Sequence, residues 1–207
     1  MSDDLTPSPK VLKLSRRDQQ REDTRNRLFE AALAEFRRVG FADAQIDDIV
    51  RAAGVARGTF YFHFPTKDHV LVELQRRGQE SIVERLAALR RRSWAVKSFL
   101  HNLIDAVIAE SVSGGQPALH REIFALFARQ PMALQGQDYP LLEAVMQFFR
   151  EAQERGEVRA DLMPLELTTI FLTSMFGVLL SQPESLGPEL RPALKRVIDV
   201  FVRGVAP

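Results

Sequence analysis

The segment from Arg57 to Lys67 carries side chains that proteins use to read and grip double-stranded DNA. A guanidinium such as that of Arg57 can bind guanine O6 and N7 together, and the methyl group of Thr59 can pack on thymine. Tyr61 and Lys67, six residues apart, supply a phenol and an ammonium that can reach neighbouring phosphates. Side chains of these types could contact both the bases and the phosphates of a nucleic acid.

The residues before this segment predict a second short helix and a tight turn. Apolar residues recur at helical spacing: Ile46, Ile49, Val50 and Ala53. Asp47 and Asp48 lie in the first turn, where the helix dipole favours anions. Gly54 ends this helix because glycine adopts the left-handed backbone of a turn, and Pro65 ends the next one. Two short helices joined in this way predict a helix-turn-helix, although such corners also occur in proteins that bind no DNA.

Helical periodicity extends over nearly the whole chain without strand alternation, so we expect an all-α fold. One helix leads up to Gly40, and a long helix starts after Thr66 and runs to the basic residues 90–92. Further helices are expected over roughly 95–112, 117–130, 139–156, 164–182 and 188–204.

Composition excludes several classes of function. The 207 residues include no cysteine, which excludes disulfides and thiolate metal sites and favours a cytoplasmic protein. The net charge of +1 means that any nucleic-acid signal must be local, and the first nine residues do not resemble a secretory signal. The apolar segment 167–180 is shorter than the roughly 20 residues of a membrane span, so no membrane association is expected.

Catalytic and metal-binding patterns are also missing from the sequence. The histidines His69, His101 and His120 are widely spaced and form no ligand motif, and there is no nucleophile triad or phosphate-binding glycine loop. We therefore expect no catalytic residue, no metal and no cofactor, and a small helical enzyme is the remote hypothesis.

The stretch IDDIVRAAGVARGTFYFHFPTKD, residues 46–68, resembles the DNA-binding signature of the TetR family of transcriptional regulators, and the resemblance covers roughly residues 24–72. It implies a three-helix DNA-binding domain, a helical-bundle domain for effector binding and dimerisation, and repression relieved by a ligand. Two residues depart from the family pattern. Gln45 stands where a threonine is frequent and can still reach a phosphate, whereas Ala56 replaces a serine and can neither cap the next helix nor donate.

The resemblance also implies roles for individual residues. Tyr61 and Lys67 match positions that touch the DNA backbone, and Gly58 would let the helix approach that backbone closely. His63 is either a base or phosphate contact or a solvent-facing cap of its helix. The predicted DNA-binding set is Gln45, Arg57, Gly58, Thr59, Tyr61, His63 and Lys67.

We expect three regions along the chain: a disordered basic lead over 1–23, the helix-turn-helix domain over 24–72, and the ligand-binding and dimerisation domain over 73–207. Residues Lys10 to Arg21 of the lead either reach a minor groove as an arm or remain a solvated, flexible segment. In the third region, aromatic and methionine side chains are core by default but could also line a pocket for a small apolar or aromatic effector. The candidates are Phe99, Phe124, Phe127, Phe148 and Met175.

Segment 167–180 is apolar nearly all round, which one chain can hardly bury alone, so it and the last helix predict a dimer interface. Its candidate residues are Ile170, Phe171, Ser174, Gly177, Val178, Val197 and Phe201. A simple buried core helix is the competing interpretation. A homodimer would place two recognition helices about 34 to 36 Å apart on a roughly palindromic operator. The alternative function is a helical small-molecule-binding or carrier protein that does not bind DNA.

Overall fold

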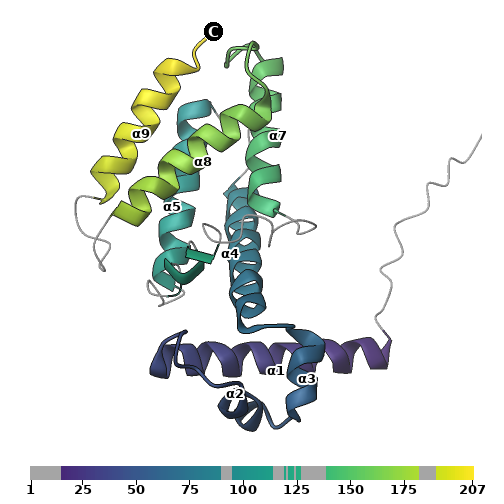
Figure 1. Cartoon of the computed structure of the whole chain (residues 1–207). Helices are drawn as coiled ribbons and strands as arrows, with labels where there is room; N and C mark the ends of the chain where they lie inside the picture. Colours follow the sequence, from purple (N-terminus) through teal and green to yellow (C-terminus); the bar gives the residue numbers. More distant parts are fainter. Residues whose placement is uncertain are drawn as a thin grey trace, which may run out of the picture. The chain divides into compact units, whose positions relative to one another are not determined.

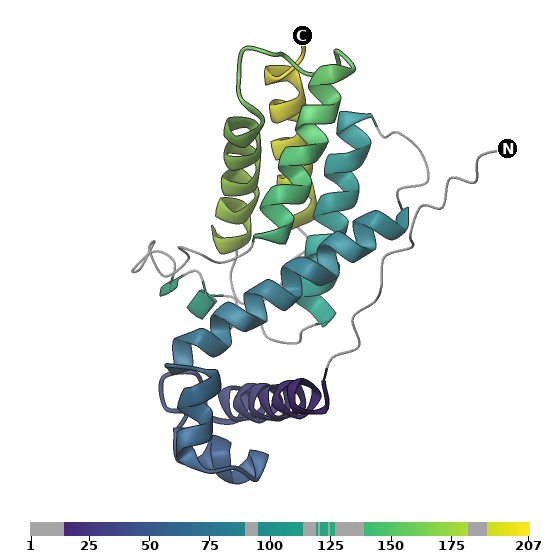
Figure 2. The same ribbon diagram turned by 90° about the vertical axis from the view of Figure 1, so that its right-hand side faces the viewer.

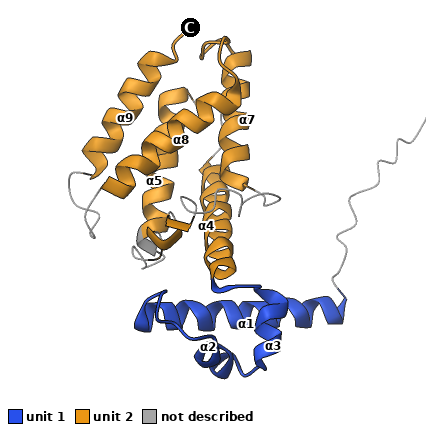
Figure 3. Cartoon of the chain, in the orientation of Figure 1, with its two compact units in different colours: residues 1–67 blue, residues 68–207 orange. Residues whose placement is uncertain are grey.

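The computed structural model describes residues 15–89, 95–113, 119, 121–123, 125–126, 139–181 and 190–207. These residues form α-helices and the turns between them, and no strand occurs in the described ranges, which confirms the all-α prediction. The chain divides into two compact units, residues 1–67 and 68–207, coloured separately in Figure 3. The division falls inside one helix, between Lys67 and Asp68.

The first unit contains α1 (Arg16–Val39), α2 (Ile46–Ala53) and α3 (Arg57–His63), with α2 packed against both of the others (Figure 1). Its core consists of apolar side chains from all three helices and the residue after α3: Leu28, Phe29, Ala32, Phe36, Ile49, Phe60 and Phe64. Burial of Phe60 and Phe64 fixes which side of α3 faces inward. The opposite side of α3 is therefore presented to solvent.

Helix α1 begins earlier than predicted. Ser15 is its N-cap, and the Ser15 hydroxyl accepts a hydrogen bond from the Asp18 backbone N–H at 3.2 Å. The Asp18 carboxylate also lies in the first turn, where the helix dipole favours an anion. The prediction of a disordered lead is thus wrong for residues 16–23, which are helical. The remainder of that lead, including Lys10 and Lys13, lies outside the described residues.

The turn between α2 and α3 has the predicted left-handed glycine. Gly54 adopts φ +66°, and the Val55 N–H that follows donates to the Val50 carbonyl at 3.0 Å. This arrangement closes the end of α2 and reverses the chain within three residues of the start of α3. A helix-turn-helix is the result.

The second unit continues from α4 (Lys67–Leu89) into α5 (Val96–Ser113), α7 (Pro140–Glu154), α8 (Pro164–Ser181) and α9 (Leu190–Gly204). Figure 2 shows α5, α7, α8 and α9 side by side, in agreement with the packing of α8 between α7 and α9. Tyr139 is the N-cap residue of α7, and burial raises the pKa of its phenol. Of the helix predicted over 117–130, residues 119, 121–123 and 125–126 are helical, and the others lie outside the described residues.

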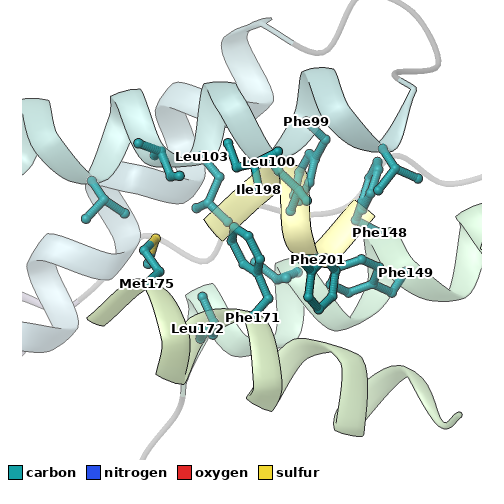
Figure 4. Close-up of a cluster of buried hydrophobic side chains, with 14 of the residues drawn as sticks. Phe99, Leu100, Leu103, Phe148, Phe149, Phe171, Leu172, Met175, Ile198 and Phe201 are labelled. Atoms are coloured by element: carbon teal, nitrogen blue, oxygen red, sulfur yellow. The ribbon is translucent and has the colours of Figure 1, made fainter. Parts of the chain in front are cut away.

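A cluster of aromatic side chains forms the core of the second unit (Figure 4). The rings of Phe99 and Phe148 are stacked with centroids 3.6 Å apart and planes 8° from parallel. Met175 is fully buried elsewhere in the same cluster. Phe171 and Phe201 contact each other edge to face at 5.1 Å within the same cluster. The assignment of Phe171 and Phe201 to a dimer interface is therefore wrong, because their side chains face the core of their own chain.

Helix α8 is long and apolar enough, by length and composition, to cross a membrane. Only 28% of its 18 residues are buried in the single chain. Phe171, Leu172 and Met175 on its inner side pack into the core. On its other side, Ile170, Ser174 and Gly177 recur at helical spacing and are exposed. The helix thus presents an exposed side of small, hydroxyl-bearing and some apolar residues as well as a buried apolar side.

Candidate nucleic-acid interface

The outer side of α3 carries the residues expected to contact DNA. Because Phe60 is buried, Arg57 and Tyr61, one helical turn apart, project together into solvent. The Arg57 guanidinium carbon lies 6.0 Å from the Tyr61 ring centroid, and Arg57 Nη2 lies 3.5 Å from the Tyr61 hydroxyl. The two side chains predicted to contact a base and a phosphate therefore share one exposed surface.

Gly58 lies between them on the exposed start of α3. A Cβ placed on Gly58 would come within 4 Å of none of the described groups outside its own stretch of helix. The fold of this unit therefore does not require glycine at position 58. Thr59, the next residue, is partly buried and therefore less accessible than Arg57.

Asp47 of α2 holds the Arg57 guanidinium. Arg57 Nη1 donates to the two carboxylate oxygens of Asp47 at 2.7 and 2.9 Å, and the Arg57 and Asp47 side chains are 58% and 59% exposed. The hydrogen bond to Tyr61 and the negative charge of Asp47 raise the pKa of Arg57. The carboxylate of Asp47 was expected only to interact with the helix dipole, so its contact with Arg57 was not predicted. Its signal, opposite charges ten residues apart across a turn, is not specific.

Lys67 is engaged by the backbone between α1 and α2. Its Nζ donates to the carbonyl oxygens of Phe41 at 2.8 Å, Ala42 at 3.0 Å and Ala44 at 2.9 Å. An ammonium has three hydrogens, so these carbonyls account for its full donor capacity. The ammonium also lies 5.1 Å from the Phe41 ring centroid. In this arrangement Lys67 stabilises the turn that leads into α2.

The two departures from the family pattern have clear local structure. Gln45 is the exposed N-cap residue of α2, and its side-chain amide donates to the Asp43 carbonyl at 3.0 Å instead of capping the helix. Ala56 is the N-cap residue of α3, where a methyl group can accept no hydrogen bond. The Ala56 backbone carbonyl nevertheless accepts a hydrogen bond from the Thr59 N–H at 2.9 Å.

His63 differs from both of its predicted roles. Its side chain is only 9% exposed, so it is neither a solvent-facing cap nor an accessible DNA contact. The His63 carbonyl accepts a hydrogen bond from Arg25 Nη1 at 3.1 Å. Burial, followed by the positive charges of Arg25 and Arg21, lowers the pKa of the imidazole. The neutral ring is thus a packed part of the unit.

Arginines of α1 pack on Phe62 of α3 and on Phe64, the residue after α3, and these contacts were not predicted. The Arg21 guanidinium lies 5.0 Å from the Phe62 ring centroid, and the Arg25 guanidinium lies 4.7 Å from that of Phe64. These contacts join residues about 40 positions apart, so no local pattern could have signalled them. They bring cations of α1 to the edge of the recognition helix.

The described ranges contain no group of three or more histidine, cysteine, aspartate or glutamate side chains that could hold a metal ion. The ionised groups of this surface are paired carboxylates and guanidiniums, which suit positioning and recognition.

Comparison with known proteins identifies relatives of the chain. Residues 28–74 match the family model described as bacterial regulatory proteins, tetR family. The HTH-type transcriptional regulator UidR of Escherichia coli is 27% identical over 162 residues, which cover 76% of this chain and 81% of UidR. The regulator SrpR of Pseudomonas putida is 50% identical over 50 residues, 24% of each chain.

Solved structures show the same fold. The FadR repressor of Thermus thermophilus, solved in complex with lauroyl-CoA, superposes with a TM-score of 0.74 at 22% identity, covering 87% of this chain and 94% of that one.

Proposed function

Because the chain belongs to the TetR family of bacterial regulatory proteins and is a DNA-binding transcriptional regulator, we propose that it is a repressor released from its operator by a small molecule. The observation that carries the DNA-binding role is the exposed side of α3, on which Arg57, Gly58 and Tyr61 are all accessible to solvent. Arg57 reads a base and Tyr61 donates to a phosphate. The protein acts in the cytoplasm.

The operator is roughly palindromic because the protein binds it as a homodimer. Uncovered apolar side chains on α8 and α9 support this state: Ile170 is 50% exposed and Val200 is 73% exposed. Ser174 and Gly177 continue the exposed side of α8, while Val178 and Val197 are partly buried at the margin of the core. A second copy of the chain covers this surface, which accounts for an apolar helix that one chain leaves mostly unburied.

The effector is a small apolar or aromatic molecule bound within the second unit. Phe99, Phe148 and Met175 belong to an apolar cluster there, while the candidates Phe124 and Phe127 lie outside the described residues. The similar FadR of Thermus thermophilus binds lauroyl-CoA, a ligand with a long apolar chain. An apolar ligand inserted into this cluster would separate rings that are now in contact.

Helix α4 transmits this change because the chain passes through it from one unit into the other. Two polar contacts connect α4 to other helices of the second unit. Ser81 Oγ donates to Glu110 Oε2 of α5 at 2.6 Å, and Gln79 Oε1 accepts from the Leu141 N–H of α7 at 3.3 Å. A ligand that shifts α5 or α7 therefore shifts α4, and it releases DNA by binding more tightly to the shifted state.

Selection of bound sequences from a random duplex library, at two salt concentrations, tests the DNA-binding role. We expect a two-fold-symmetric site whose affinity falls steeply with salt. Arg57→Ala should reduce operator affinity by roughly 10- to 100-fold and erase the preference at one symmetric pair of guanines, because a bidentate contact contributes about 1–3 kcal/mol. A folded dimer that enriches no sequence, with and without candidate ligands, would favour the carrier protein instead.

Gly58→Ala separates the requirements of folding from those of DNA binding. An exposed glycine in a helix costs about 0.5–1 kcal/mol relative to alanine, and the space around Gly58 is open. We therefore expect thermal unfolding of the variant at an equal or higher temperature, together with operator affinity at least about fivefold lower because the methyl group would meet the DNA backbone. Equal operator affinity for the variant and the parent protein would show that DNA does not approach this point.

A further inference from the structure

The ion pair between Asp47 and Arg57 joins the two helices of the helix-turn-helix at its outer surface. Asp47 receives both of its short contacts from Arg57 Nη1, while Arg57 Nη2 faces the Tyr61 hydroxyl. The guanidinium is thus held from two sides before any DNA is present. An exposed pair of this kind contributes little to stability, so stability does not explain its geometry.

Resting on the proposed DNA-binding function, we propose that Asp47 is a positioning residue for specificity, which makes Arg57 read a base rather than bind any phosphate. An unpaired arginine binds phosphates of every sequence, which raises non-specific affinity. Asp47 neutralises the Arg57 charge locally, and a phosphate would have to displace this carboxylate. Guanine has no charge to repel Asp47. Its O6 and N7 atoms can accept hydrogen bonds from the N–H groups of the five-donor guanidinium that Asp47 does not bind.

The chain contains a matched control one residue away. Asp48 also lies in the first turn of α2 and also pairs with an arginine, since Arg51 Nη1 lies 2.6 Å from Asp48 Oδ1. Asp48→Asn removes the same charge from the same turn of helix, but it leaves Arg57 in place. A difference between the Asp47 and Asp48 variants therefore reports on Arg57, not on the net charge of α2.

The experiment measures binding of full-length protein to the selected operator and to a scrambled duplex of equal length over a range of salt. We expect Asp47→Asn to bind the scrambled duplex at least about threefold more tightly, with a salt slope steeper by about 0.9, the value for one additional phosphate contact. Operator affinity should fall about threefold, so that the ratio of operator to scrambled affinity drops about tenfold. Asp48→Asn should keep the ratio of the parent protein.

The same substitution in the Arg57→Ala background completes a double-mutant cycle. If Asp47 acts through Arg57, Asp47→Asn has no further effect on the ratio once Arg57 is absent. An effect that persists without Arg57, or that equals the effect of Asp48→Asn, would mean that Asp47 only repels DNA and would overturn the proposal. An unchanged ratio for Asp47→Asn would overturn it as well.

Failure of the proposed function would look different. In that case the parent protein would prefer no sequence, and both proposals would fall. Thermal unfolding of each variant serves as the folding control, and we expect little change because Asp47, Asp48 and Arg57 are each more than one-third exposed.

Discussion

Replacing Lys67 with methionine is expected to destabilise the N-terminal unit by about 2–3 kcal/mol, because three backbone carbonyls lose a charged donor at once. Methionine retains much of the apolar stem, so the change removes mainly the ammonium. Hydrogen exchange of the full chain should show that amides of residues 41–53 exchange faster in the variant than in the parent protein, whereas amides of the second unit exchange at the same rate in both. This stretch contains the carbonyls of Phe41, Ala42 and Ala44 and the helix α2 that follows them.

Hydrogen exchange and the salt dependence of DNA binding together distinguish this role from a phosphate contact. A lysine that only touched DNA would leave exchange unchanged, while its loss would reduce the slope of log affinity against log salt by about 0.9. Lys195→Met, which removes an exposed lysine of α9, is the control for lost charge. Unchanged exchange in residues 41–53 of Lys67→Met would contradict the stabilising role.

Val200→Asp is expected to convert the protein to a monomer and to reduce operator affinity by at least about 100-fold. The side chain of Val200 is 73% exposed in the single chain, so aspartate costs that chain little. In a two-fold interface each contact occurs twice, and two unpaired carboxylates would be buried together. Sedimentation or light scattering measures the mass, and binding to a full operator and to a half-site measures the loss of two-headed binding.

Leu89→Asp provides the control for this change. Leu89 is also a large apolar residue and is 54% exposed, but it is the last residue of α4 and so lies outside α8 and α9. We expect this variant to remain a dimer with nearly the operator affinity of the parent protein. Retention of the dimer mass by Val200→Asp, or its loss by Leu89→Asp, would contradict a dimer interface formed by α8 and α9.

The helix-turn-helix could be predicted from the sequence because its signals are local. The apolar spacing from Ile46 to Ala53, the turn glycine Gly54 and the stop at Pro65 all fall within 20 residues. Ser15 followed by Asp18 is an equally local signal for the start of α1. It was missed because the surrounding arginines and carboxylates suggested a solvated segment.

The contacts of the candidate site could not be predicted in the same way. Lys67 binds carbonyls at least 23 residues earlier in the chain, and backbone carbonyls leave no trace in a sequence because every residue has one. Asp47 and Arg57 meet only because the turn at Gly54 brings the beginnings of α2 and α3 together. His63 looked like a surface residue, whereas packing in the folded unit buries it.

The error at the predicted dimer interface has a different cause. Helix α8 is apolar nearly all round, so its periodicity cannot tell which side faces the core of its own chain. Phe171 and Ile170 are adjacent in sequence, yet one is fully buried and the other is half-exposed. Only the packing of α7 and α9 on α8 determines this choice.

The placement of the two tyrosines gives the molecule a pair of built-in spectroscopic reporters. Tyr61 lies on the exposed side of α3, and Tyr139 lies at the start of α7 in the other unit. Uniform incorporation of fluorotyrosine would therefore yield two ¹⁹F resonances, one from each unit, without any engineered label. The Tyr61 resonance would follow occupancy of the operator and the Tyr139 resonance would follow the effector, so that one spectrum could display communication between the units in both directions.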